Sequence, residues 1–148
     1  MRNIKYIGLS LLLMIAFQGM SQDAVEETPP EQKAYNDALA KYEEGKYRDA
    51  IVAFNQAING GIKDKEAYVK RGIAYYKTKQ YDDAKADFDD AVKARVNSSE
   101  LYEYRGRVKY EQKDFDGASA DLAKAATMGM KSADGLYMMG NSYFPNDN

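Results

Sequence analysis

The side chains with the most evident capacity for chemistry are the carboxylates of one short acidic stretch. Asp82-Asp83 and Asp87-Phe88-Asp89-Asp90 place five aspartates within nine residues. Carboxylate oxygens are calcium ligands, but no loop glycine follows here at the spacing that a calcium loop needs. Lys85 and Lys93 stand four and three residues from Asp89 and Asp90. On a helix this spacing favours a solvated, ion-paired face over a metal site.

Most other catalytic chemistry is removed by composition. The 148-residue chain has no histidine and no cysteine, so the commonest general base, the thiol nucleophile and the main zinc ligands are missing. Gly60-Gly61 is not a phosphate loop, because no Lys-Ser or Lys-Thr follows it. A carboxylate-based hydrolase would require two Asp or Glu side chains to converge in one pocket, and no pair is placed to nominate. We therefore predict a protein that is not an enzyme and uses no metal or cofactor.

Aromatic side chains offer a different kind of site, one for binding. Tyr42, Tyr76, Tyr110 and Phe144 follow one another at one constant interval. Aromatic rings with a few cationic neighbours make good anchors for an extended peptide or a helix. The alternative is that each tyrosine packs against a neighbouring element, with its hydroxyl reaching water. Both readings stay open at this point.

The same interval runs through the rest of the chain, and we call it the repeat interval. It separates Ala50, Ala84 and Ala118 from one another. It also relates three further sets, which are Tyr47, Tyr81 and Phe115; Phe54, Phe88 and Leu122; and Ala57, Ala91 and Ala125. A repeat of about 34 residues predicts a stack of helix pairs, since one pair alone cannot bury its apolar face.

Helical periodicity and turn residues give the expected elements. Asp64 and Ser98 are natural caps for the helices that follow them, Ser132 is a third, and Thr28 before Pro29 reads as the first helix start. No stretch alternates with period two for long enough to predict a strand. We expect helices at about 31–44, 47–59, 65–78, 81–94, 99–112, 115–127 and 133–144, with ends uncertain by roughly 2–4 residues.

The second unit carries the clearest motif, which consists of Tyr68, Arg71-Gly72, Tyr75, Tyr81, Ala84, Phe88 and Ala91. This pattern resembles the tetratricopeptide repeat. The third unit keeps it at Tyr102, Arg105-Gly106, Phe115, Ala118, Leu122 and Ala125. The resemblance covers nearly all of the chain after the segment 1–30. It implies an all-α solenoid of three helix-turn-helix repeats plus a terminal helix, with units at about 31–64, 65–98, 99–132 and 133–144.

Small residues in the motif have a direct physical role. Gly72, Gly106 and Gly140 remove a side chain where the two helices of a pair come closest, and the repeated alanines do the same from the opposite helix. The chain departs from the family pattern where Arg71 and Arg105 replace the leucine before the glycine. We interpret these arginines as drift that the fold tolerates.

In this family the first helix of each pair lines a concave groove. The resemblance implies a partner-binding groove made of Tyr35, Tyr42, Lys70, Tyr76, Lys77, Tyr104, Arg107, Tyr110, Tyr137 and Phe144. The family's clamp for a C-terminal carboxylate would need a Lys near Tyr35 and an Asn near Leu39, and neither is present. We therefore expect another protein or peptide as partner, but not a chaperone tail held by its carboxylate.

Export is predicted by the start of the chain. Arg2 and Lys5 precede an apolar run over 6–17, and Gly19 and Ser21 are spaced for cleavage before Gln22. This run is shorter than the roughly 20 residues that cross a bilayer. We expect a signal peptide over 1–21, a linker over 22–30 and the repeat domain over 31–148, in a periplasmic or secreted protein.

The remaining chain is mildly acidic. Losing Arg2 and Lys5 leaves 19 basic against 23 acidic side chains, a net charge of −4, which argues against a nucleic-acid partner or an anionic membrane surface. We expect an adaptor or scaffold that binds protein. The alternative is a structural subunit that self-associates through its last helix, as a homodimer with Met138, Met139 and Tyr143 at the interface.

Overall fold

The computed structural model describes residues 27–144, and every element within them is helical. The expected all-α fold is confirmed, and each predicted helix agrees with the observed one to within one residue at either end. The helices are α2 (Pro30–Glu43), α3 (Tyr47–Asn59), α4 (Glu66–Lys77), α5 (Tyr81–Lys93), α6 (Ser99–Glu111), α7 (Phe115–Thr127) and α8 (Ala133–Tyr143). The predicted signal peptide, and most of the predicted linker, lie outside the described residues. None of the helices in this range is long and apolar enough to cross a membrane.

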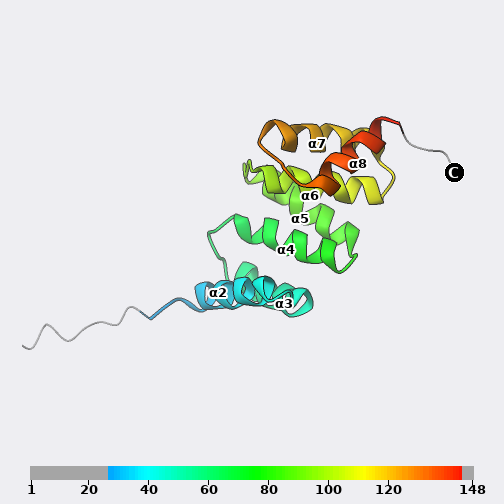
Figure 1. Ribbon diagram of the computed structural model, residues 1–148. Helices are drawn as coiled ribbons and strands as arrows, with labels where there is room; N and C mark the ends of the chain where they lie inside the picture. The colour runs from blue at the N-terminus through cyan, green and yellow to red at the C-terminus, as the bar shows by residue number, and fades with distance from the viewer. Residues whose placement is uncertain (1–26, 145–148) are drawn as a thin grey trace, which may run out of the picture.

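The helices form three pairs that stack in chain order (Figure 1). Each pair packs on the next, and α8 covers the end of the stack against α7 and α6. The first helices α2, α4, α6 and α8 contact one another in succession, whereas the second helices α3, α5 and α7 make no contact with each other. The first helices therefore line the inner, concave side of the solenoid.

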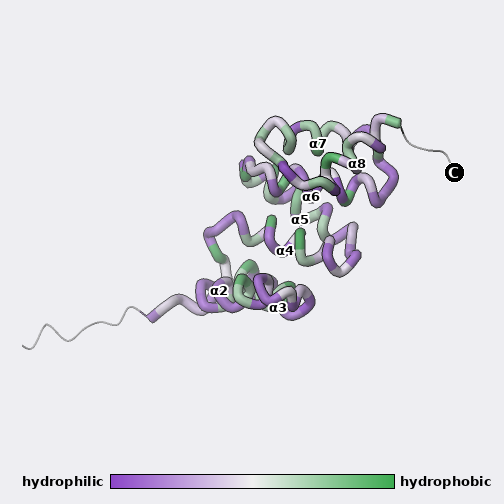
Figure 2. Tube along the Cα trace, in the orientation of Figure 1, coloured by the Kyte–Doolittle hydropathy of each residue, from purple (hydrophilic) through white to green (hydrophobic). Residues whose placement is uncertain are grey.

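Glycines and bulky apolar side chains fit together inside the pairs. Phe88 and Leu122 are fully buried. A Cβ atom on Gly72 would lie 2.7 Å from the ring of Phe88, and one on Gly106 would lie 2.7 Å from Leu122. The close approach predicted at these two glycines is thus confirmed. In Figure 2, α7 is largely hydrophobic while α2 is mostly hydrophilic.

Turns recur with the repeat as well. The turn within each pair contains a residue with left-handed backbone, which is Gly45, Lys79 or Lys113, with φ of 74°, 62° and 62°. Lysine has a Cβ that disfavours this conformation. The tight geometry of the pair therefore overrides local preference in the second and third units.

The predicted serine caps are present. The side chains of Ser98 and Ser132 accept hydrogen bonds from the third residue after each of them. Asp64 accepts one from the Glu66 N–H at 3.0 Å, but the N-cap position of α4 is Lys65, which has no capping side chain. The prediction for Thr28 is wrong. Helix α2 begins at Pro30, with Pro29 at its N-cap position and no capping side chain, so Thr28 lies too far from the exposed N–H groups.

Candidate protein-binding face

Side chains from successive first helices meet along the concave side. Tyr42 comes from α2, and the Lys70 Nζ of α4 lies 5.5 Å from the centre of its ring. One unit further, Tyr76 of α4 meets Tyr104 of α6 edge to face, with ring centres 5.5 Å apart. Lys70 and Tyr104 are equivalent positions of the repeat, so the same contact is made at both unit boundaries with a different residue type.

Tyr104 lies at the centre of this arrangement. The Lys77 Nζ is 5.6 Å from its ring centre, and the Arg107 Cζ is 5.2 Å from it. Burial raises the pKa of the Tyr104 hydroxyl, while the positive charge of Arg107 opposes that rise. Burial likewise raises the pKa of the Tyr42 and Tyr76 hydroxyls. The phenols of this cluster are therefore neutral at physiological pH and can donate as well as accept hydrogen bonds.

Arg107 is buried rather than free on the groove surface. Its Nη2 donates to Glu103 at 2.7 Å and also to the Ser132 hydroxyl. Ser132 caps α8, so the guanidinium ties α6 to the start of the last helix. Lys70 is similarly engaged, because its Nζ lies 2.7 Å from the Glu100 carboxylate.

The aromatic residues at the end of each first helix also serve the scaffold. Tyr110 packs edge to face on Phe115, with ring centres 5.5 Å apart. The corresponding distances are 5.6 Å for Tyr42 with Tyr47 and 5.8 Å for Tyr76 with Tyr81. One face of each ring therefore closes the turn of its own pair, and the tyrosines are left partly exposed.

The other predicted groove residues lie apart from this cluster. Tyr35 is buried in the core of the first unit, where its ring lies 6.0 Å from that of Phe54. Its side chain is thus part of the packing and not of the surface. Tyr137 and Phe144 are well exposed at the α8 end of the stack. The structure therefore brings together Tyr42 with Lys70, and Tyr76, Lys77 and Arg107 with Tyr104.

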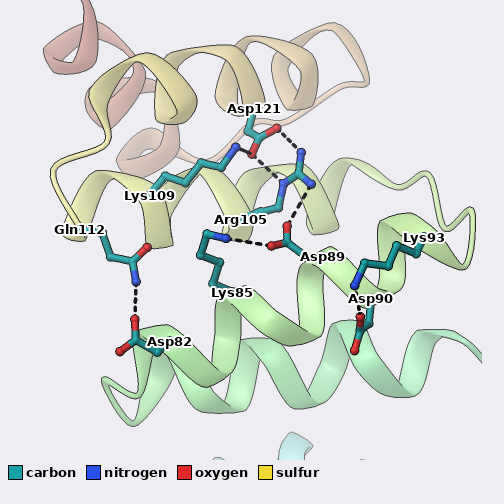
Figure 3. A network of polar contacts seen from close by, with 9 residues as sticks. All are labelled: Asp82, Lys85, Asp89, Asp90, Lys93, Arg105, Lys109, Gln112 and Asp121. Atoms are coloured by element: carbon teal, nitrogen blue, oxygen red, sulfur yellow. Dashed lines mark hydrogen bonds and ion pairs between the residues drawn. The ribbon is translucent and has the colours of Figure 1, made fainter.

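Two arginine clamps were missed by the sequence analysis. The Arg71 guanidinium of α4 binds both oxygens of Asp87 on α5, with Nε at 2.8 Å, and its Nη1 donates to Asn55 on α3 at 2.7 Å. Arg105 of α6 repeats this with Asp121 on α7, at 2.7 and 2.6 Å, and with Asp89 on α5 at 3.5 Å (Figure 3). Each arginine thus joins its own pair to the pair before it.

These contacts correct two interpretations. Arg71 and Arg105 are not drift, since each is partly buried and pairs with a buried aspartate of its own helix pair. Asp87 does not belong to a solvated face, because only 3% of it is exposed. The surface pairs Lys85 with Asp89 and Lys93 with Asp90 are present as predicted, at 2.9 and 2.7 Å (Figure 3). A sequence signal for the clamps exists, because Arg and Asp recur sixteen residues apart in both units.

Two shallow hollows lie near the first turn, between α3 and the end of α4. They are lined by Gly45, Lys46, Tyr47, Arg48, Asp49 and Thr78 in one case, and by Arg48, Ile51, Thr78 and Gln80 in the other. Asp49 is the single carboxylate in these two linings. They therefore lack the converging pair that a carboxylate-based hydrolase needs.

Comparisons with known proteins agree with the stacked pairs. A family model of the tetratricopeptide repeat matches residues 35–94 and 69–133. The first TPR domain of Spaghetti (RPAP3), bound to the HSP90 peptide SRMEEVD, matches with a TM-score of 0.69 and 15% identity over 79% of this chain and 93% of that chain. The second TPR domain of human RPAP3, in complex with the HSP70 peptide SGPTIEEVD, gives 0.65 and 18% over 74% and 92%.

A third similar structure is PcrH in complex with the chaperone binding region of PopB. It matches with a TM-score of 0.61 and 14% identity, over 83% of this chain and 96% of that chain. No curated protein matches the sequence. At these identities the solved structures establish the fold of the stacked helices.

Proposed function

This chain belongs to the tetratricopeptide repeat family, and from that premise we propose that it is a noncatalytic module that binds another protein or a peptide on its concave side. The solved structures of similar fold include two domains bound to short peptides and one bound to a segment of another protein. They support the class of partner. The identity of the peptide does not transfer at 14 to 18% identity.

The observation that carries the proposal is the aromatic cluster around Tyr104. Tyr42, Tyr76 and Tyr104 come from three successive first helices, and each is fixed on one side by a contact at 5.5 to 5.8 Å. Side chains held in this way lose little conformational entropy when a ligand binds, so the ordering cost falls mainly on the ligand. Rigid aromatic anchors of this kind commonly dominate the binding energy of an interface.

The ligand chemistry that suits this cluster is an extended peptide with apolar side chains and acidic neighbours. Lys77 over the Tyr104 ring is well exposed, and its charge can meet a carboxylate. The setting that we propose is an adaptor or scaffold in the cell envelope, in the periplasm or outside the cell. Support for export comes from the basic start and the apolar run within the segment 1–21.

A capture experiment tests this function. The full chain would be used to retain partners from an envelope extract, with identification by mass spectrometry and competition by peptides of the retained protein. The variant Tyr76→Ala with Tyr110→Ala should lose the partner. The control is Val52→Ala, which removes an exposed apolar side chain from the second helix α3, outside the aromatic cluster. Circular dichroism and melting are measured on each variant. Unfolding of the double variant, or capture by it that equals the parent, would contradict the groove.

A second candidate function is a structural subunit that forms a homodimer through α8, with Met138, Met139 and Tyr143 at the interface. The observation that favours it is the exposure of Tyr143. Met138 and Met139 contribute less, because both pack on the core cluster of the third unit. Sedimentation velocity over a range of concentrations tests it, since a dimer should form in the parent and be lost in Met139→Lys.

A further inference from the structure

One face of helix α8, at the end of the stack, is not covered by any other helix of the part of the chain that the structure describes. Within residues 27–144, the exposed large apolar side chains are Leu136 (43%), Tyr137 (68%), Tyr143 (56%) and Phe144 (82%), all at this end, and Val52 on α3. Leu136, Gly140 and Tyr143 follow one another at spacings of four and three, so they lie on one side of the helix. We call this side the α8 face.

The repeat identifies what covers the equivalent face in the other units. Leu136, Gly140 and Tyr143 correspond to Tyr68, Gly72 and Tyr75 of α4, two repeat intervals earlier. There, the helix α5 covers the face, and Phe88 lies where a Cβ on Gly72 would be. At Gly140 none of the described residues lies within 4 Å of the corresponding position. The glycine that admits a second helix is present, and the described part of the chain supplies no helix to meet it.

Phe144 is also uncovered, at the C-terminal end of α8, where the turn of a complete unit would begin. In each complete unit the equivalent aromatic packs on the first residue of the second helix, at 5.6 Å for Tyr42 with Tyr47 and 5.8 Å for Tyr76 with Tyr81. No such ring pair involves Phe144 within the part of the chain that the structure describes, and 82% of its surface is exposed. Two separate contacts of a second helix are therefore open on α8.

We propose that the α8 face is a docking site for an amphipathic helix of another protein, which completes a fourth helix pair in trans. The three second helices of this chain define its chemistry. Each carries an aromatic residue, an alanine three positions later, a Phe or Leu four positions after that, and an alanine three positions further on, as in Tyr47, Ala50, Phe54 and Ala57. The aromatic would meet Phe144, and the Phe or Leu would lie over Gly140.

The clamp position adds a selection rule. The residue before the glycine is Arg71 in α4, where it binds Asp87, but it is Met139 in α8. If a docked helix carried an aspartate at the position of Asp87, that carboxylate would face Met139 instead of an arginine. Burying a carboxylate without a cation costs binding free energy. Helix α3 has Ala53 at that position. The site should therefore accept helices with a small apolar residue there and reject those with aspartate.

A second copy of the chain is a poor source of this helix. Phe54, Phe88 and Leu122, the side chains that would have to enter the Gly140 site, are all fully buried within their own pairs. Removing one would expose the core of a unit. We therefore assign the docked helix to a different polypeptide as part of this proposal, at a site separate from the concave side.

A peptide taken from the chain itself provides the probe. A fluorescent peptide with the sequence of Tyr47–Asn59 is titrated with the full chain, and binding is followed by anisotropy. We expect saturable binding that weakens at least about tenfold, a difference of about 1.4 kcal/mol, when the peptide carries Ala53→Asp. The same loss is expected when the chain carries Gly140→Leu. Leucine has open space there, so circular dichroism of this variant should match the parent.

Matched controls make the result decisive. Ala40→Leu enlarges an exposed residue of α2 in the same way and should leave binding unchanged. Binding that survives Gly140→Leu would mean that the peptide enters another unit, and would overturn the proposal, as would no binding at all.

Sedimentation velocity completes the test. A dimer of the parent that is abolished by Gly140→Leu would show that a second copy occupies the face, and would likewise overturn it. The double variant Tyr76→Ala with Tyr110→Ala should still bind the peptide, which separates this site from the concave one.

Discussion

The two arginine clamps occupy equivalent places in the second and third units. The pKa of the buried carboxyl is nevertheless raised in one clamp and lowered in the other. Burial raises the pKa of the Asp87 carboxyl, and Arg71 only partly offsets it. Burial acts on Asp121 as well, but Arg105 and Lys109 together bring the pKa of that carboxyl below its ordinary value. Neighbouring charges explain the difference, because Asp90 and Asp83 raise the pKa of the Asp87 carboxyl further, whereas a second cation meets Asp121. The residue that contacts Asp121 at 2.7 Å is Lys109, and its equivalent in the second unit is Tyr75.

This comparison shows how a repeat can keep its geometry while changing its electrostatics. Both clamps join three helices across a unit boundary, and both hold a first helix of the concave side in place. A buried ion pair with one cation is close to balance between desolvation and attraction, whereas a second cation favours the charged state. The helix pair of the third unit is therefore the one held by the stronger charge network (Figure 3).

Removing the guanidinium from each clamp should give the largest difference between them in the free energy of unfolding. Arg71→Met keeps the aliphatic stem but leaves Asp87 buried with no cation, and we expect a loss of about 3–5 kcal/mol in the free energy of unfolding. Arg105→Met leaves Asp121 paired with Lys109, so the expected loss is smaller, about 1–3 kcal/mol. Urea unfolding at pH 7, followed by circular dichroism, measures both.

A double variant checks the cause of that loss. Arg71→Met combined with Asp87→Leu replaces the pair by apolar groups, and most of the stability should return, because an ion pair in the interior can be exchanged for well-packed apolar residues at little cost. An equal or larger loss in Arg105→Met than in Arg71→Met would show that Lys109 does not sustain the second clamp.

The pH dependence should distinguish the two carboxylates by sign. Asp121 binds its proton more weakly in the folded state, so its stabilising contribution is full above the ordinary pKa of 3.8 and is lost as pH falls through the folded value. Asp87 binds its proton more tightly when folded, so protonation above pH 3.8 favours the fold. The deficit of Asp121→Asn against the parent should therefore shrink as pH falls, and that of Asp87→Asn should grow.

Urea unfolding of the parent and both variants between pH 7 and pH 3 gives these two deficits. Surface carboxylates titrate over the same range, but they are common to all three proteins and cancel in the differences. Deficits that change with pH in the same direction would mean that the two clamps are electrostatically alike.

The fold could be predicted because its signals are local and repeated. Gly72 and Gly106, with alanines spaced by the same repeat interval, specify close helix pairs, and the helix ends follow from the turns between them. The clamps could not be predicted in the same way. Arg71 and Asp87 are each ordinary surface residues by type, and only the approach of α4 to α5 decides that they are buried together. Their recurrence at one spacing in both units was the available signal.

The sequence could predict where the aromatic residues of the candidate site lie along the helices, but not which of the predicted side chains are exposed and which are buried or paired. The constant interval between aromatic residues predicted one ring for each first helix, and Tyr42, Tyr76 and Tyr110 lie in the last turns of α2, α4 and α6, while their role in binding stays a prediction. It could not show that Arg107 turns to Glu103 and Ser132, or that Tyr35 enters the core, because both depend on side chains from distant parts of the chain. The position of a residue in the family's repeat does not distinguish one predicted groove residue from another. Packing in the folded chain decides which of them are exposed and which are buried.

The smallest expected effect tests the residue that distinguishes the clamps. Lys109→Met removes the second cation and keeps the stem, so the pKa of the Asp121 carboxyl should rise, as burial has raised that of Asp87. The free energy of unfolding at pH 7 should fall by about 1 kcal/mol. Carboxyl NMR titration of Asp121 measures the pKa. The matched control is Lys41→Met on α2, whose partner Asp37 four residues away is exposed and whose loss should cost about 0.3–0.5 kcal/mol. An Asp121 pKa that stays low without Lys109 would assign the whole effect to Arg105, and the difference between the clamps would then have to come from Asp83 and Asp90, whose charges raise the pKa of the Asp87 carboxyl.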